Sequence, residues 1–108
     1  MNPETKKGDI YWVNFSPTIG TEIRKIRPAL IIFSSTKRVI ALPITSNTKQ
    51  TDLWQIVIKK LVKGKDGKIL VDQIRSFDKQ RLLRKIGEIA GKDVKKVREM
   101  LREMLLLD

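Results

Sequence analysis

Short runs of β-branched and aromatic residues, each ended by Gly, Pro or a polar turn, fill the first two-thirds of the chain. This pattern constrains the fold more than any other feature, because such runs are typical of strands. Pro43 places the end of the third run at a sheet edge or a bulge, and a turn is expected over 64–67. The expected strands cover 9–15, 28–33, 38–44, 53–58, 68–74 and a less regular 84–89.

The C-terminal segment changes to helical spacing. Its apolar residues are Val94, Val97, Leu101, Met104 and Leu105, with charged residues on the other face. This spacing predicts a helix over 92–107 that packs on the strands. Many short strands with one closing helix are typical of a small, curved, partly open barrel, mostly β within the α+β class. The length predicts a single domain over 1–108.

The charge balance indicates which kind of molecule the protein binds. Lys and Arg number 23 against 12 acidic residues, a formal net charge of +11. Such a surplus indicates a polyanion or an acidic protein as partner. No run approaches the roughly 18–20 apolar residues of a membrane span, so no membrane association is expected. The chain has no Cys, which excludes a disulfide scaffold and is compatible with a cytoplasmic protein.

The absence of His restricts the chemistry further. Without His and Cys, a zinc site would need carboxylates alone, which is rare. Paired-histidine acid–base catalysis of RNA hydrolysis is excluded. Any catalysis must therefore use Arg, Lys, Glu, Asp, Ser, Thr or Tyr, and no metal or other cofactor is expected.

Four segments resemble, in order, the motifs of the MazF/PemK family of type II toxin–antitoxin endoribonucleases. They are GDIYWVNFSP at 8–17, GTE at 20–22 with RPALI at 27–31, LPITS at 42–46 and LVDQIRSFD at 70–78. The resemblance implies an SH3-like, partly open barrel of the PemK/CcdB type. It also implies a homodimer, an acidic antitoxin, and cleavage of single-stranded RNA. The ribose 2′-hydroxyl would attack without a metal, giving a 2′,3′-cyclic phosphate and a 5′-hydroxyl.

Arg27 and Thr45 are the first candidates for that chemistry. Arg27 precedes Pro28, which favours an extended backbone at the entry to a buried strand. Its guanidinium suits the charge that develops on phosphorane oxygens, although an ordinary solvated Arg would fit the spacing too. Thr45 follows the apolar run 39–44 and can donate to a phosphate oxygen. Its alternative role is to cap a turn.

Glu22 is the third catalytic candidate, as the carboxylate that takes the 2′-hydroxyl proton. Its alternative role, which we favour, is to pair with Arg24 or Arg27. The chain departs from the family at this point, because Ile23 stands where members often have Gln, and Arg24 and Lys25 add a basic pair. The RNA preference of the family therefore does not transfer to this chain.

Other residues are candidates for RNA contacts. Gln73 can read a base edge or satisfy buried backbone, and Ser46 is a weaker substitute for Thr45. Among the aromatic residues, Trp12, Phe15 and Trp54 are considered for stacking on bases. For Trp12 a core position is favoured, because it lies within a strand, and Trp54, which borders a loop, is the more open of the three. The full set of predicted RNA contacts is Arg24, Lys25, Ser46, Lys49, Gln73, Ser76 and Lys79.

Two other functions stay open on the sequence alone. A CcdB-type toxin has the same fold but binds gyrase and cleaves nothing, and it has no need of the Arg27 and Thr45 motifs. A non-catalytic barrel that binds nucleic acid explains the charge but not the four ordered motifs.

Overall fold

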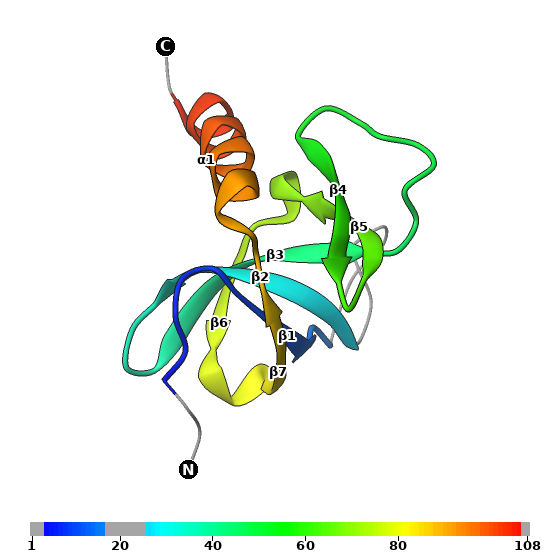
Figure 1. Ribbon diagram of the computed structural model, residues 1–108. Coiled ribbons are helices and arrows are strands. Elements are labelled where there is room, and N and C mark those ends of the chain that lie inside the picture. The colour runs from blue at the N-terminus through cyan, green and yellow to red at the C-terminus, as the bar shows by residue number, and fades with distance from the viewer. Residues whose placement is uncertain (1–3, 17–25, 107–108) are drawn as a thin grey trace.

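The structure is a computed structural model that describes residues 4–16 and 26–106 (Figure 1). The predicted mostly-β, partly open barrel with a closing helix is confirmed. No helix in the described ranges is long and apolar enough to cross a membrane. The elements are β1 Asp9–Asn14, β2 Ile26–Ser34, β3 Arg38–Thr45, β4 Gln55–Val62, β5 Lys65–Leu70, η1 Val71–Gln73, β6 Arg75–Asp78, η2 Lys79–Arg81, β7 Leu82–Glu88 and α1 Gly91–Leu105.

The strands form one antiparallel sheet that branches at β3. Its order is β4-β5-β3-β2-β1-β7, and β6 pairs with β3 off this path. One side of β3 pairs with β2, whereas the other side pairs with β6 over residues 38–41 and with β5 at Ile44 and Thr45. The β4–β5 hairpin and β6 therefore leave β3 at opposite ends. This branching curls the sheet into a half-open barrel.

Two hydrophobic clusters fill the two sides of the sheet. Along β1, Ile10 belongs to the cluster under α1, whereas Tyr11 and Val13 belong to the opposite cluster, as the alternation of strand side chains requires. Val97 of α1 is buried in the first cluster. In the second, the rings of Phe15 and Phe77 meet edge to face with centroids 5.6 Å apart.

Two arginines fix the end of β1, immediately before residue 17. Arg75 Nη1 donates to the carbonyl oxygen of Phe15 at 2.9 Å, and its guanidinium lies 5.8 Å from the centroid of the Phe15 ring. Arg81 Nη1 donates to the carbonyl oxygens of Asn14 and Ser16. Three consecutive carbonyls are thereby held by charged donors, which are stronger than neutral ones.

The expected strand over 68–74 is wrong in its second half. β5 ends at Leu70, the chain makes the 3-10 turn η1, and the separate strand β6 follows. Val71 is fully buried, so the apolar run continues while the backbone turns from β5 toward a different part of β3. Periodicity reports burial and does not reveal this change of partner.

Two smaller expectations also differ from the structure. The turn between β4 and β5 has two residues, Lys63 and Gly64, and not the four over 64–67. Pro43 lies in the interior strand β3, opposite Ala29, and the register shift of this pair lies elsewhere. Pro43 lies between the part of β3 that pairs with β6 and the part that pairs with β5. A missing amide donor is tolerated there because that side of β3 has no registered partner.

Candidate active site

The antiparallel pairing of β2 and β3 brings the two leading catalytic candidates together. Ala29 lies opposite Pro43, and Leu30 lies opposite Leu42. That register ends at Ala29 and Pro43, and Arg27 and Thr45 each lie two residues beyond it, toward the open ends of the two strands. The sequence separates these residues by a whole hairpin, and the sheet brings both of them to one pocket.

Arg27 and Thr45 line one pocket of about 250 Å³, together with Ser46. Its apolar floor consists of Trp12 of β1, Pro28, which lies opposite Trp12 on β2, and Ile44 of β3. The β4–β5 hairpin supplies the other wall and lies beside the open ends of β2 and β3 (Figure 1). The residues of that wall are Val62, Lys63, Lys65, Asp66 and Gly67.

The side chains of Arg27 and Thr45 form few hydrogen bonds within the described residues. Arg27 is half-buried, and its Nε is buried with no hydrogen-bond partner within the described residues. Such a donor is costly to leave unpaired. Thr45 Oγ1 accepts a hydrogen bond from the backbone N–H of Asn47 at 3.2 Å. The turn-capping role is thus present, and it leaves the hydroxyl hydrogen free to donate.

The loop after β3 is held by side chains. Ser46 and Lys49 are both exposed, and the backbone N–H of Lys49 donates to Asn47 Oδ1 at 3.2 Å. Lys68 was not predicted as a site residue, yet it lies opposite Thr45 on β5 and is only 6% exposed. Its Nζ donates to the carbonyl oxygen of Gln50. This buried ammonium therefore ties the loop that carries Ser46 and Lys49 to the strand beside Thr45.

Two predicted RNA contacts lie elsewhere in the fold. Ser76 pairs with Ile40, five residues before Thr45 on β3, which is roughly 16 Å along a strand. Its Oγ accepts hydrogen bonds from Arg38 Nε at 3.3 Å and Nη2 at 3.1 Å. Gln73 is half-buried in η1 and is not among the residues that line the Arg27 pocket.

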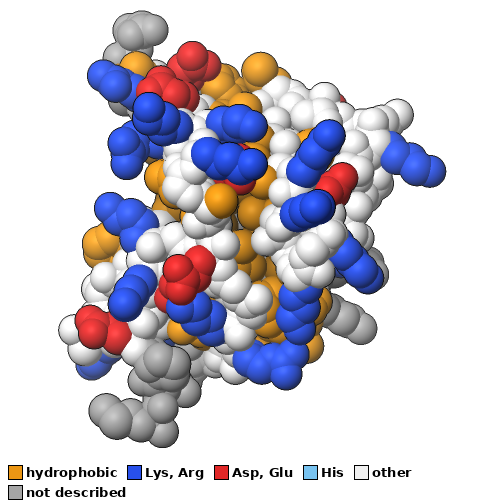
Figure 2. All heavy atoms as spheres, viewed as in Figure 1, with side chains coloured by type: hydrophobic (Ala, Val, Ile, Leu, Met, Phe, Trp, Pro, Cys, Tyr) orange, Lys and Arg blue, Asp and Glu red, His pale blue; other side chains and the backbone are white. Residues whose placement is uncertain are grey.

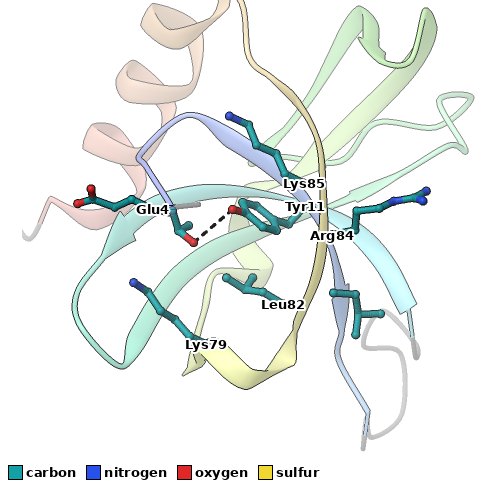
Figure 3. Close-up of a pocket in the computed structure, with 8 residues that line it drawn as sticks. Glu4, Tyr11, Lys79, Leu82, Arg84 and Lys85 are labelled. Atoms are coloured by element: carbon teal, nitrogen blue, oxygen red, sulfur yellow. Dashed lines mark hydrogen bonds between the residues drawn. The ribbon is translucent and has the colours of Figure 1, made fainter. Parts of the chain in front are cut away.

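Lys79 lies in a different pocket, of about 430 Å³, beside β1 and β7 (Figure 3). Tyr11 stands at its centre, and Thr5 Oγ1 donates to the Tyr11 hydroxyl at 3.3 Å. Lys85, at the rim, is bound to Glu88 at 2.9 Å and to Asp9 at 3.1 Å. The hydrogen bond to Glu88, followed by that to Asp9, raises the pKa of Lys85. Lys79 thus lines a different pocket from Arg27.

The remaining predictions divide into three groups. Glu22, Arg24 and Lys25 lie outside the described residues. Phe15 is fully buried, so its ring is not open for base stacking, and Trp54 is half-buried against the cluster under α1. The expectation that Trp12 lies in the core is wrong, because it is half-buried at the pocket floor and joins neither cluster.

Lys63 and Lys65 are pocket residues that no motif indicated. They belong to the run 59–68, in which five of ten residues are lysine, and which was interpreted only as strand and turn. That lysine density was the available signal. Figure 2 shows Lys and Arg side chains around the hairpin side of the molecule, with few acidic side chains among them. The site is thus a small pocket with an apolar floor and a cationic rim.

The half-open barrel matches the fold that the resemblance implies. Residues 6–105 match the family described as PemK-like, MazF-like toxin of type II toxin–antitoxin systems. The chain is 37% identical to Endoribonuclease EndoA of Bacillus subtilis, over 94% of this chain and 95% of that protein. The chain therefore belongs to the MazF/PemK toxin family, as predicted.

Solved structures agree with this assignment. The crystal structure of MazF from Deinococcus radiodurans superimposes with a TM-score of 0.82 at 27% identity, covering 96% of this chain and 98% of that one. A MazE–MazF crystal structure from the same organism gives a TM-score of 0.70 at 25% identity, covering 94% and 95%.

Proposed function

We propose that the protein is the toxin of a type II toxin–antitoxin system and an endoribonuclease that cleaves single-stranded RNA in the cytoplasm. The observation that carries the proposal is the convergence of Arg27 and Thr45 in one pocket, from two separate motifs. Family membership and the name of the Bacillus subtilis relative support the same activity. The +11 charge suits a polyanionic substrate.

The proposed chemistry is transesterification by the substrate's own ribose. The 2′-oxygen attacks the adjacent phosphorus as its proton leaves, and the bond from phosphorus to the 5′-oxygen breaks. The leaving oxygen takes a proton, so the products are a 2′,3′-cyclic phosphate and a 5′-hydroxyl. The step needs no metal, and the chain has neither His nor Cys to supply the usual ligands of one.

Three residues have roles in this step. The guanidinium of Arg27 stabilises the charge that develops on the phosphorane oxygens. The hydroxyl of Thr45 donates to one of these oxygens while Asn47 N–H holds it in place. Glu22 is proposed as the carboxylate that takes the 2′-hydroxyl proton, and its pairing with Arg24 or Arg27 is the alternative role.

The other predicted contacts are assigned by their place in the fold or, for Arg24 and Lys25, by sequence alone. Ser46 and Lys49 lie on the loop beside Thr45 and contact the nucleotides next to the cleaved bond. Arg24 and Lys25, which precede Arg27 in the sequence, are proposed to do the same. Gln73, Ser76 and Lys79 do not line the pocket. They are proposed to bind parts of the extended RNA strand farther from the scissile phosphate.

Substitution of Thr45 tests its hydroxyl. Thr45→Val keeps the shape but loses the hydroxyl, both as donor to the phosphate oxygen and as acceptor from Asn47 N–H. One neutral hydrogen bond is typically worth about 0.5–1.5 kcal/mol, so the lost donation to RNA should slow single-turnover cleavage by about twofold to tenfold. Thr45→Ser should retain most of the rate, because both the hydroxyl and its bond to Asn47 N–H are kept. Equal losses in the two variants at unchanged melting temperature would exclude the proposed role.

Assembly is the second part of the proposal. We infer a homodimer, with RNA lying across a basic groove near the interface, and an acidic antitoxin segment that folds on the toxin and blocks RNA. Large apolar side chains exposed in the described part of the chain provide surface for such contacts. They are Ile26, Phe33, Leu53, Val57, Leu83, Leu105 and Leu106.

Analytical ultracentrifugation at micromolar concentration checks this assembly. The protein alone should sediment at twice the 12.5 kDa of the chain, and adding the antitoxin encoded beside it should give a larger complex that no longer binds RNA. A 12.5 kDa species alone would count against the dimer. A basic antitoxin, or one that leaves RNA binding unchanged, would count against the second inference.

A further inference from the structure

The β4–β5 hairpin is the part of the pocket that no sequence motif indicated. Five lysines lie in its sequence, at 59, 60, 63, 65 and 68. Only Lys63 and Lys65, at the tip, line the Arg27 pocket. Lys59 and Lys60 are exposed on the same hairpin but do not line it. The fold therefore selects two of these lysines and directs them to the candidate active site.

The backbone at the tip is unfavourable for lysine. Lys63 and Gly64 have φ angles of 49° and 78° and form the two-residue turn between Val62 and Lys65. Turns with positive φ at both positions favour Asn-Gly. A lysine at the first position carries a steric penalty that Asn largely avoids. Such outliers gather at functional sites, and here the outlier is a pocket residue.

Two contacts fix the tip against the pocket. Asp66 Oδ1 accepts a hydrogen bond from the backbone N–H of Lys60 at 3.0 Å, where Lys60 also has a positive φ of 55°. A Cβ on Gly67 would lie 3.0 Å from Ile44 Cγ2 and 3.2 Å from Leu61 Cδ2, so the side chains of Ile44 and Leu61 pack closely over β5 at a position where Gly leaves room. The hairpin is thus held beside the pocket floor.

The charges at this wall are uncompensated. Within the described residues, neither Lys63 nor Lys65 forms an ion pair. Arg27 adds a third cation to the lining, and Asp66 is the single acidic residue that lines the pocket among those described. The Asp66 carboxylate is already engaged by the Lys60 N–H. Three cations against one acid favour a ligand with more than one negative charge.

We propose that Lys63 and Lys65 bind the RNA backbone phosphate next to the scissile one, so that the β4–β5 hairpin is the second wall of the RNA site. This inference rests on the proposed ribonuclease function. Arg27 and Thr45 are assigned to the reacting phosphate, and the hairpin tip lies across the same small pocket. Ammonium groups on long side chains act as point charges on phosphates, so these lysines contribute affinity rather than chemistry.

The experiment uses two matched substitutions, Lys63→Asn and Lys60→Asn. Both remove one exposed charge at a positive φ that Asn tolerates, so neither should lower the melting temperature. The probe is a mixed-sequence RNA that is 2′-O-methylated throughout and so cannot be cleaved by 2′-hydroxyl attack. Lys63→Asn should raise its Kd by about threefold to tenfold. It should also reduce the slope of log Kd against log salt by about 0.7, the value for one contact on a single strand.

The controls separate this inference from the function on which it rests. Lys60→Asn should leave the Kd unchanged, and Lys65→Gln should repeat the loss without touching the turn. Wild-type affinity in Lys63→Asn and Lys65→Gln would overturn the proposal. An equal loss in Lys60→Asn would also overturn it, because the effect would then be general charge. If the wild type neither binds the probe nor cleaves ordinary RNA, the proposed function itself fails.

Discussion

Arg27→Ala is expected to slow single-turnover RNA cleavage by about 10²–10³-fold while the protein stays folded. Removal of a preorganised donor to developing charge typically has an effect of this size. The residue is half-buried at the start of β2, with a side chain that is in neither core cluster. Because its contact strengthens mainly in the transition state, the loss should fall on turnover more than on RNA binding. Circular dichroism checks the fold of the variant.

Two variants sharpen this test. Arg27→Lys should also cleave poorly, because an ammonium keeps the charge but cannot hold two oxygens with a planar fork. Arg98→Ala removes an exposed arginine from α1 and should cleave at the wild-type rate. Near wild-type cleavage by Arg27→Ala would show that the catalytic arginine lies elsewhere.

Phe77→Ala should give the largest loss of stability among the substitutions considered. Phe77 is 3% exposed and packs edge to face with the fully buried Phe15. Truncation of a buried Phe to Ala typically lowers the free energy of unfolding by about 3–5 kcal/mol. For a domain of this size the melting temperature should fall by more than about 12 °C. Urea denaturation measures the difference in unfolding free energy directly.

Phe33→Ala is the matched control, because Phe33 is 48% exposed on β2. Its unfolding free energy should change by less than about 0.5 kcal/mol, as for most surface substitutions. If both variants unfold at the same urea concentration as the wild type, the Phe15–Phe77 pair does not hold β1 to β6 as described.

The strands were predictable where burial and alternation act locally. β1, β2 and β3 are each rich in apolar residues and end at turn residues, so their bounds differ from the prediction by only a few residues. The break between β5 and β6 was not predictable in this way, because Val71 continues the apolar pattern through a turn. The chain turns there to pair with a different part of β3, and no local residue encodes that partner.

The candidate site was predictable only in part, because strand pairing decides which of the motif residues come together. Arg27 and Thr45 come from two motifs, and the pairing of β2 with β3 brings both of them to one pocket. Ser76 comes from a motif too, but β6 pairs with the opposite end of β3 and carries Ser76 away from Thr45. The position of Trp12 within a strand predicts a core residue, but in the structure Trp12 lines the open pocket.

Lys63 and Lys65 show what the linear sequence could not provide. A lysine-rich turn is ordinarily a solvated surface feature. Its role here depends on β5 lying against β3, where the side chain of Ile44 packs closely at Gly67. The sequence shows that this segment is rich in lysine, but only the three-dimensional arrangement shows that Lys63 and Lys65 lie in the same pocket as Arg27.

The central claim is that this chain cleaves RNA through the 2′-hydroxyl without a metal. The most direct measurement is incubation of the purified protein with a long mixed-sequence RNA in excess EDTA, beside Arg27→Ala purified in the same way. We expect discrete fragments that end in 2′,3′-cyclic phosphate and 5′-hydroxyl groups from the wild type, and intact RNA from the variant. Intact RNA in both samples together with inhibition of gyrase would contradict this account and favour the CcdB-type function, and cleavage that EDTA abolishes would contradict the metal-free step.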